Sequence, residues 1–272
     1  MKKFTRSSLV FALVSSLVSS MAFAAPDWSK VDATEVFVFH PGATPWQWVS
    51  SKGKHGGSRG LARGEACIGC HTEGKEINLD MSRLSSELEP AGAPQTKLYP
   101  VKVQAAYDTD NLYLRLSFKA PMGGFDKGDK ENELKATVLM AEPTVPMGNM
   151  VGCWATCHED ARTMPGANPQ KTKYVKEGGY ALMQWASKTG VSDGSVTTER
   201  KMTGGNAGVK AEASQSGDGY TVTFTRKNPG IGKTVPIGIA IHADHASGRF
   251  HHVSLGYNLG IGAEGDIKAV KQ

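Results

Sequence analysis

The stretch that decides the fold is VKVQAAYDTDNLYLRLSF, residues 101–118. Apolar residues alternate with polar ones on both sides of Asp108-Thr109-Asp110-Asn111, a sequence typical of a turn. Successive side chains of a strand point to opposite faces of a sheet. The pattern therefore predicts two half-buried antiparallel strands that are joined as a hairpin.

Further short strands are expected on both sides of this hairpin, because Gly-, Asp- and Ser-rich turns separate several apolar segments. Residues 171–188 are the best helix candidate, although two adjacent glycines weaken it. We predict a mainly β protein whose residues 96–272 form a β-sandwich. The expected strands are 35–40, 135–141, 209–213, 220–226, 235–242 and 250–257.

The first 24 residues have the pattern of a secretory signal peptide. Three basic residues within 2–6 precede an apolar run over 9–17, and small residues at 22 and 24 precede a cleavage site at Ala25. The run is short and interrupted by serines, so we expect cleavage, a periplasmic protein and no stable membrane insertion. An uncleaved anchor is the alternative. Three of the positive charges behind the net charge of +5 lie in this segment. The net charge therefore gives no reason to expect a nucleic-acid partner.

All four cysteines fall into two close pairs, and a histidine follows each pair directly. The first motif is Cys67-Ile68-Gly69-Cys70-His71, and the second is Cys153-Trp154-Ala155-Thr156-Cys157-His158. The CxxCH spacing is that of covalent haem attachment, in which two thiols bind one porphyrin and the next imidazole binds its iron. The second motif has one extra residue between its cysteines and is a rarer variant. We therefore predict two covalent haem c groups, of which the first has the more specific motif.

Other interpretations of the cysteines remain open. An exported chain can pair its cysteines as disulfides, here Cys67 with Cys70 and Cys153 with Cys157. A zinc site is weaker, because zinc does not require a histidine directly after each pair. A haem held without covalent bonds is an alternative for the second motif.

The axial ligands of the two irons are predicted from the histidines. His71 and His158 are the expected proximal ligands. For the sixth position of the first iron we favour His55, in the glycine-rich loop before Cys67. For the second iron we favour His252 or His251, of which at most one faces a given haem, because adjacent strand residues point to opposite faces. The other candidates carry a ring nitrogen or a thioether sulfur, and they are His40, His242, His245, Met147, Met150 and Met164.

The haem motifs suggest two units. Residues 25–95 are expected to form a small irregular and partly helical segment around the first haem. Residues 96–272 are expected to form the β-sandwich with the second motif in a long loop. The proline-rich stretch over 85–100 is typical of a linker. The relative placement of the two haems therefore stays open.

Three segments together carry a resemblance to a known family: the 101–118 hairpin, Met147-Gly148-Asn149-Met150 before Cys153, and RFHHVSLG at 249–256. Residues 96–260 resemble the haem-binding domain of the ethylbenzene dehydrogenase gamma-subunit type. The block over 39–71 resembles the extra haem segment of related c-type cytochromes. The resemblance implies a β-sandwich with haem at one end and periplasmic electron transfer. Gamma subunits hold haem b through Met and Lys, whereas the second cysteine pair here predicts covalent attachment and a stand-alone dihaem cytochrome.

We therefore expect a carrier of single electrons with no catalytic residues. Its partners would be periplasmic redox proteins that it meets through a transient interface. The alternatives are a dihaem peroxidase or reductase, or a haem-based gas sensor, each with one open iron site. Glu159 and Asp160 are the acid/base candidates for an enzyme. A haem-free β-sandwich with two disulfides is the remaining alternative.

Overall fold

The computed structural model describes residues 25–41, 55–73, 76–79, 93–123, 126–145, 147–152, 178–248 and 250–272. This part of the chain is mainly β, as predicted, and its helices are short. The helices are η1 (Trp28–Lys30), α2 (Ser58–Ala62), α3 (Cys67–His71) and α5 (Gly148–Val151). The strands are β1 (Thr34–Phe39), β2 (Thr72–Glu73), β3 (Glu76–Ile77), β4 (Leu98–Tyr107), β5 (Asn111–Lys119), β6 (Lys135–Ala141), β7 (Tyr180–Ala186), β8 (Gly190–Val196), β9 (Arg200–Lys201), β10 (Lys210–Ser216), β11 (Gly219–Lys227), β12 (Lys233–His242), β13 (His252–Ser254), β14 (Tyr257–Ile261) and β15 (Ile267–Lys271).

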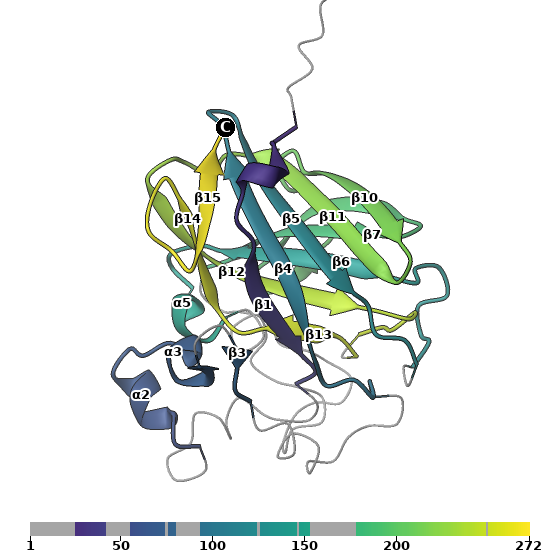
Figure 1. Ribbon diagram of the computed structural model, residues 1–272, viewed down its shortest axis with the longest axis horizontal. Helices are drawn as coiled ribbons and strands as arrows, with labels where there is room; N and C mark the ends of the chain where they lie inside the picture. The colour runs from purple at the N-terminus through teal and green to yellow at the C-terminus, as the bar shows by residue number, and fades with distance from the viewer. Residues whose placement is uncertain are drawn as a thin grey trace, which may run out of the picture.

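One 13-stranded sheet dominates the molecule and folds over into two layers (Figure 1). Its strand order is β10-β11-β5-β4-β1-β13-β12-β6-β7-β8-β9. Strands β14 and β15 form a second bridge between β12 and β4. The two layers are therefore joined twice, through β1–β13 and through β15–β14, and the apolar core lies between them.

The β4–β5 hairpin has the structure that its sequence predicts. Val101 pairs with Phe118, and Tyr107 pairs with Leu112 on either side of the turn. The carboxylate of Asp108 accepts hydrogen bonds from the backbone N–H groups of the turn, including that of Asn111 at 2.6 Å. The inward-facing side chains of both strands are buried. The alternation of apolar and polar residues therefore identified the face of the hairpin that packs on the core.

Two expectations about elements are wrong. Residues 180–186 of the expected helix form strand β7, which pairs with β6 and β8 on its two sides. Pairing on both edges satisfies the backbone and overrides a weak helix preference; residues 171–177 lie outside the described part. The strand expected over 250–257 is two strands, because the chain turns at Leu255-Gly256 from the β1 pairing towards β15.

Strand β1 is part of the large sheet and pairs with both β4 and β13. Val36 and Val38 are fully buried in the main core. Residues 34–39 therefore pack with the sheet, although the sequence placed them with the first haem motif. The end of β1, β13, α3 and α5 all lie at the same end of the molecule (Figure 1).

No helix among the described residues has both the length and the apolar character that crossing a bilayer requires.

Candidate haem-binding site

The first cysteine pair lies on α3, with the two thiols one helical turn apart. Side chains at positions i and i+3 of a helix lie on the same side, so Cys67 and Cys70 face one region together. They are free thiols and form no disulfide with each other. Cys67 is half-buried against the core, and burial raises the pKa of its thiol to about 11. Cys70 is exposed, so the pair presents a partly buried and an accessible thiol.

His71 ends α3, and a backbone carbonyl holds its ring. Its Nδ1 lies 2.8 Å from the carbonyl oxygen of Asn78. Because a carbonyl only accepts, Nδ1 carries the proton and donates, which leaves Nε2 with a lone pair for a metal. The β2–β3 hairpin brings Asn78 back to this position, and the Asn78 N–H donates to the His71 carbonyl at 2.6 Å. This is the arrangement of a metal-binding histidine with its supporting hydrogen bond.

The ring of His55 faces the ring of His71. Their centroids are 6.0 Å apart, and their planes differ by 12°. When two imidazoles bind one iron from opposite sides, their ring centroids are roughly 6 Å apart. Each metal–nitrogen bond is about 2 Å long, and each ring centroid lies about 1 Å beyond the bound nitrogen. His55 and His71 therefore have the spacing that a haem iron between them would require. That they bind it stays a prediction.

Gly57 gives the His55 ring its space. A Cβ atom at position 57 would lie 2.6 Å from Cε1 of His55, closer than carbon atoms approach. Gly57 precedes α2, and the Gly57 carbonyl accepts a hydrogen bond from Leu61 N–H at 2.9 Å. A side chain at this position would push the imidazole out of its place opposite His71.

The second motif begins one residue after the described Gly152. Cys153, Cys157 and His158 lie outside the described residues. Helix α5, which ends at Val151, lies beside α3, with residues of the two helices within 8 Å between Cα atoms. Sequence reasoning did not foresee this contact, since 76 residues separate the end of α3 from the start of α5.

The structure separates the neighbours His251 and His252. His252 is fully buried, its Nε2 lies 2.7 Å from the carbonyl oxygen of Thr96, and the Tyr99 ring packs edge-on at 4.8 Å. Burial lowers the pKa of His252 to about 4. His251 is half-buried on the opposite face and stacks on His242 with centroids 5.0 Å apart. The expected division of this pair between two faces is therefore observed.

The remaining histidines occupy distinct places. His40 is buried at the end of β1, with Nδ1 3.2 Å from the His251 carbonyl oxygen, and its ring centroid is 6.1 Å from that of His252. His242 places Nε2 3.0 Å from the Gly248 carbonyl. His245 is held through Nδ1 by the Asp129 carbonyl at 2.9 Å. Among the methionine alternatives, Met147 and Met150 lie at α5, and Met164 is outside the described residues.

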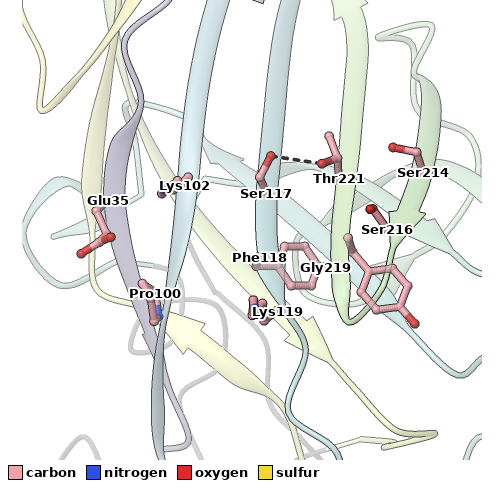
Figure 2. A pocket seen from close by; sticks show the side chains of 11 residues that line it. Glu35, Pro100, Lys102, Ser117, Phe118, Lys119, Ser214, Ser216, Gly219 and Thr221 are labelled. Atoms are coloured by element: carbon pink, nitrogen blue, oxygen red, sulfur yellow. Dashed lines mark hydrogen bonds between the residues drawn. The ribbon is translucent and has the colours of Figure 1, made fainter.

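A groove of about 340 Å³ lies on the outer face of the sheet (Figure 2). Figure 2 shows Lys102, Lys119 and Glu35 around it, with a hydrogen bond of 3.3 Å between the hydroxyls of Ser117 and Thr221. Its lining, as far as the chain is described, takes no residue from α2, α3 or α5. The groove is therefore separate from the haem-binding residues.

The site combines the thiols of Cys67 and Cys70 with the His71 imidazole, which lies opposite the His55 imidazole. These features define the class of proteins that bind haem covalently. Two curated proteins resemble the chain over nearly all of its length. Cytochrome c-552 of Stutzerimonas stutzeri is 44% identical over 291 residues, covering all of both chains. Cytochrome c-551 of Rhodocyclus tenuis is 44% identical over 253 residues, covering 91% of this chain and all of the other. The chain belongs to this family of c-type cytochromes, which carry haem c and act in electron transfer.

Two other comparisons add little. No family model matches the chain, so the resemblance to the gamma-subunit domain stays a prediction. Among solved structures, a family 9 carbohydrate-binding module from Caldicellulosiruptor kristjanssonii in complex with glucose gives a TM-score of 0.30 at 10% identity, covering 61% of this chain and 69% of that one. The same module with cellotriose gives the same TM-score at 9% identity, covering 61% and 67%. A likeness this slight supports no argument about the chain.

Proposed function

We propose that the protein is a periplasmic dihaem cytochrome that carries single electrons between redox partners. The observation that carries this proposal is the pair His55 and His71, whose rings are parallel and 6.0 Å apart. A haem iron held by both His55 and His71 would have no open position for a substrate or a gas. The first site therefore suits electron transfer better than catalysis or sensing.

The haem itself supplies a one-electron couple between ferric and ferrous iron. The chain holds the His71 ring through the Asn78 carbonyl and leaves space for the His55 ring at Gly57. The hydrogen bond from His71 Nδ1 to the Asn78 carbonyl fixes the ring orientation and leaves the Nε2 lone pair for a metal.

The second haem is supported by the CxxxCH motif, which uses both remaining cysteines and has a histidine directly after them. We infer His158 as its proximal ligand and His251, rather than His252, as its sixth ligand. His252 is fully buried, and the Tyr99 ring packs edge-on against it. His251 is half-buried, and its ring stacks on that of His242 at the opposite face.

The localisation and partners follow from the same proposal. Residues 1–24 direct export and are removed, which places the mature chain where covalent haem attachment takes place in bacteria. Its partners are other redox proteins of that compartment, bound through a small transient interface.

Intact mass and a pyridine haemochrome spectrum of the protein matured in a haem-attaching periplasm test the proposal. We expect two covalent haems on a chain that starts at Ala25. The variant C67A/C70A should lose one haem, and C153A/C157A should lose the other. A single haem in the unmodified protein would overturn the dihaem proposal.

Carbon monoxide distinguishes the carrier from an enzyme or a sensor. The reduced carrier should leave its spectrum unchanged under carbon monoxide, because both irons keep two protein ligands. A stoichiometric carbon monoxide adduct of the unmodified protein would instead support a peroxidase, a reductase or a gas sensor with one open site.

A further inference from the structure

We propose that Glu65, held by Arg63, is a positioning residue of the first haem site. Its side chain braces α2 against α3 and so keeps the His55 ring opposite the His71 ring. The inference rests on the proposed ligand roles of these two histidines and deepens them. The residues concerned all lie within 55–71, a range that the structure describes without a gap.

The two helices of the site are held in different ways. Helix α3 is fixed on the sheet, because Cys67 and Ile68 pack against the main core. In the described part of the chain, no residue of α2 belongs to that core. The described hydrogen bonds that link α2 to α3 come from the turn between the two helices.

His55 lies just before α2 and is tied to it by backbone hydrogen bonds. Ser58 N–H donates to the His55 carbonyl at 3.1 Å, and Leu61 N–H donates to the Gly57 carbonyl at 2.9 Å. These bonds form the first turn, so a rotation of α2 would carry the His55 ring with it. The distance of 6.0 Å between the His55 and His71 rings therefore depends on how α2 lies relative to α3.

The side chain of Glu65 spans the turn between the two helices. Arg63 donates two hydrogen bonds to Oε1 of Glu65, from Nε at 2.9 Å and from Nη2 at 2.7 Å. The other carboxylate oxygen, Oε2, lies beside Gly60 of α2, where a Cβ atom at position 60 would be 2.5 Å from it. The Glu65 N–H also donates to the Gly60 carbonyl at 3.0 Å. Glu65, two residues before Cys67, is therefore held against α2 through both its backbone and its side chain.

The brace acts on the ligand more than on the overall fold. Both side chains of the ion pair are exposed, and an exposed pair contributes little to the stability of a protein. At an axial position a small free energy is enough, because it changes the fraction of iron that has lost its sixth ligand by the corresponding factor. Loss of the brace should therefore appear in the exchange of the sixth ligand before it appears in the unfolding of the protein.

Displacement of the sixth ligand by cyanide in the ferric holoprotein tests the proposal. At saturating cyanide the observed rate is set by how often the protein ligand leaves the iron. The phase that becomes fast in His55→Ala belongs to the first haem. In Glu65→Gln this phase should be faster by about two- to five-fold, the factor that one exposed ion pair can supply. A phase that belongs to the second haem should keep its rate.

Glu199→Gln is the matched control for the lost charge. Glu199 forms an exposed ion pair with Lys201 at 2.8 Å in the β8–β9 hairpin, and its partner is two residues away, as Arg63 is from Glu65. This variant should leave every phase unchanged. An acceleration equal to that in Glu65→Gln would show that the loss of any surface charge is sufficient and would overturn the brace.

Two glycines provide an independent test of the same contact. Gly60→Ala should speed the first phase as Glu65→Gln does, because the added methyl group displaces the carboxylate. Gly56→Ala should not, since its Cβ position has open space, although Gly56 lies directly beside His55 in the chain. Equal rates in Gly60→Ala and Gly56→Ala would contradict the proposed contact.

The double variant R63Q/E65Q decides whether the two side chains act as a pair. As partners, they should together speed the first phase no more than Glu65→Gln alone, whereas independent effects would multiply. Multiplied effects, or an unchanged first phase in Glu65→Gln, overturn the brace and leave the ligand roles intact. An acceleration of all phases together with a lower urea midpoint would show general loosening and would also overturn it. If His55→Ala changes no phase, the proposed ligation by His55 itself fails, and the brace fails with it.

Discussion

At the scale of single residues, the site depends on the geometry of two imidazoles. His71 was predictable because it follows the second cysteine of a local motif. Its supporting partner was not, because the Asn78 contact uses a backbone carbonyl that any residue supplies. His55 was predicted from its position in a glycine-rich loop, but only the fold shows its ring parallel to that of His71.

Replacing His55 tests its role as a ligand. The variant His55→Ala should keep both covalent haems, since the cysteines are unchanged, and should convert one of them to a high-spin form that binds carbon monoxide when reduced. Absorption and carbon monoxide difference spectra measure this. His245→Ala is the matched control, because His245 is held by the Asp129 carbonyl in another loop; its spectrum should match the unmodified protein. An unchanged spectrum in His55→Ala would show that another residue fills the sixth position.

Asp129 makes a pH-dependent contribution to stability. Burial would raise the pKa of this carboxyl, but hydrogen bonds from the N–H groups of Asn132 and Glu131 and from Lys135 at 2.6 Å outweigh it, so its pKa lies well below the usual value. A carboxyl whose pKa is lower in the folded than in the unfolded state stabilises the fold above its unfolded pKa, about 4, and loses this effect as the pH falls further.

The variant Asp129→Asn should therefore lower the free energy of unfolding by about 1–2 kcal/mol at pH 7, mainly through the lost charge pair with Lys135. The difference from the unmodified protein should shrink below about pH 4, where the unfolded carboxyl is protonated. Urea unfolding at pH 7 and pH 3 measures it. A difference that is the same at both pH values would contradict the assignment.

At the scale of elements, α5 is followed by a glycine, Gly152, whose backbone meets that of Gly256. Gly152→Ala introduces strain at a positive φ and a collision with the Gly256 backbone. Gly204→Ala is the matched control, since Gly204 has a φ of 86° with open space around its Cβ position. The control should cost about 1–2 kcal/mol of stability from the left-handed conformation alone.

Gly152→Ala should cost clearly more than this control and should also lower the incorporation of the second haem. Thermal unfolding and the haem content per chain measure the two effects. Equal losses in the two variants would show that the backbone contact at Gly256 does not matter.

Element types were predictable where local alternation carries the information, as in the β4–β5 hairpin and in β6, whose bounds match the expected 135–141. They were not predictable where pairing decides. The segment 180–186 forms a strand because it pairs with β6 and β8. This pairing outweighs the weak helix preference of its sequence.

At the scale of the whole molecule, strand β1 joins the two layers. It lies between β4 and β13, and its Val36 and Val38 fill the core. Residues just before it are also tied to the sheet, because the Gln104 side chain donates to the Val31 carbonyl at 2.6 Å. The sheet is therefore incomplete without the N-terminal residues.

A fragment of residues 96–272 should consequently fail to give a cooperative thermal transition, since it exposes two strand edges and removes buried valines. A chain in which residues 25–41 are joined to 93–272 by a flexible linker should restore that transition. Circular dichroism during heating measures both. A cooperative transition in the short fragment would show that the part after residue 95 folds alone.

The sequence by itself determined the chemistry of the protein and most of its strands. Covalent haem attachment requires cysteines and a histidine within a few residues of each other, and the alternation of apolar and polar residues in a strand is also a local pattern. Both can therefore be recognised in the sequence. Only the tertiary structure decided which distant groups meet: His55 with His71, α3 with α5, β1 with β4 and β13, and His251 and His252 on opposite faces. These contacts join residues far apart in the chain, and their free energy comes from packing and strand pairing that no local pattern encodes.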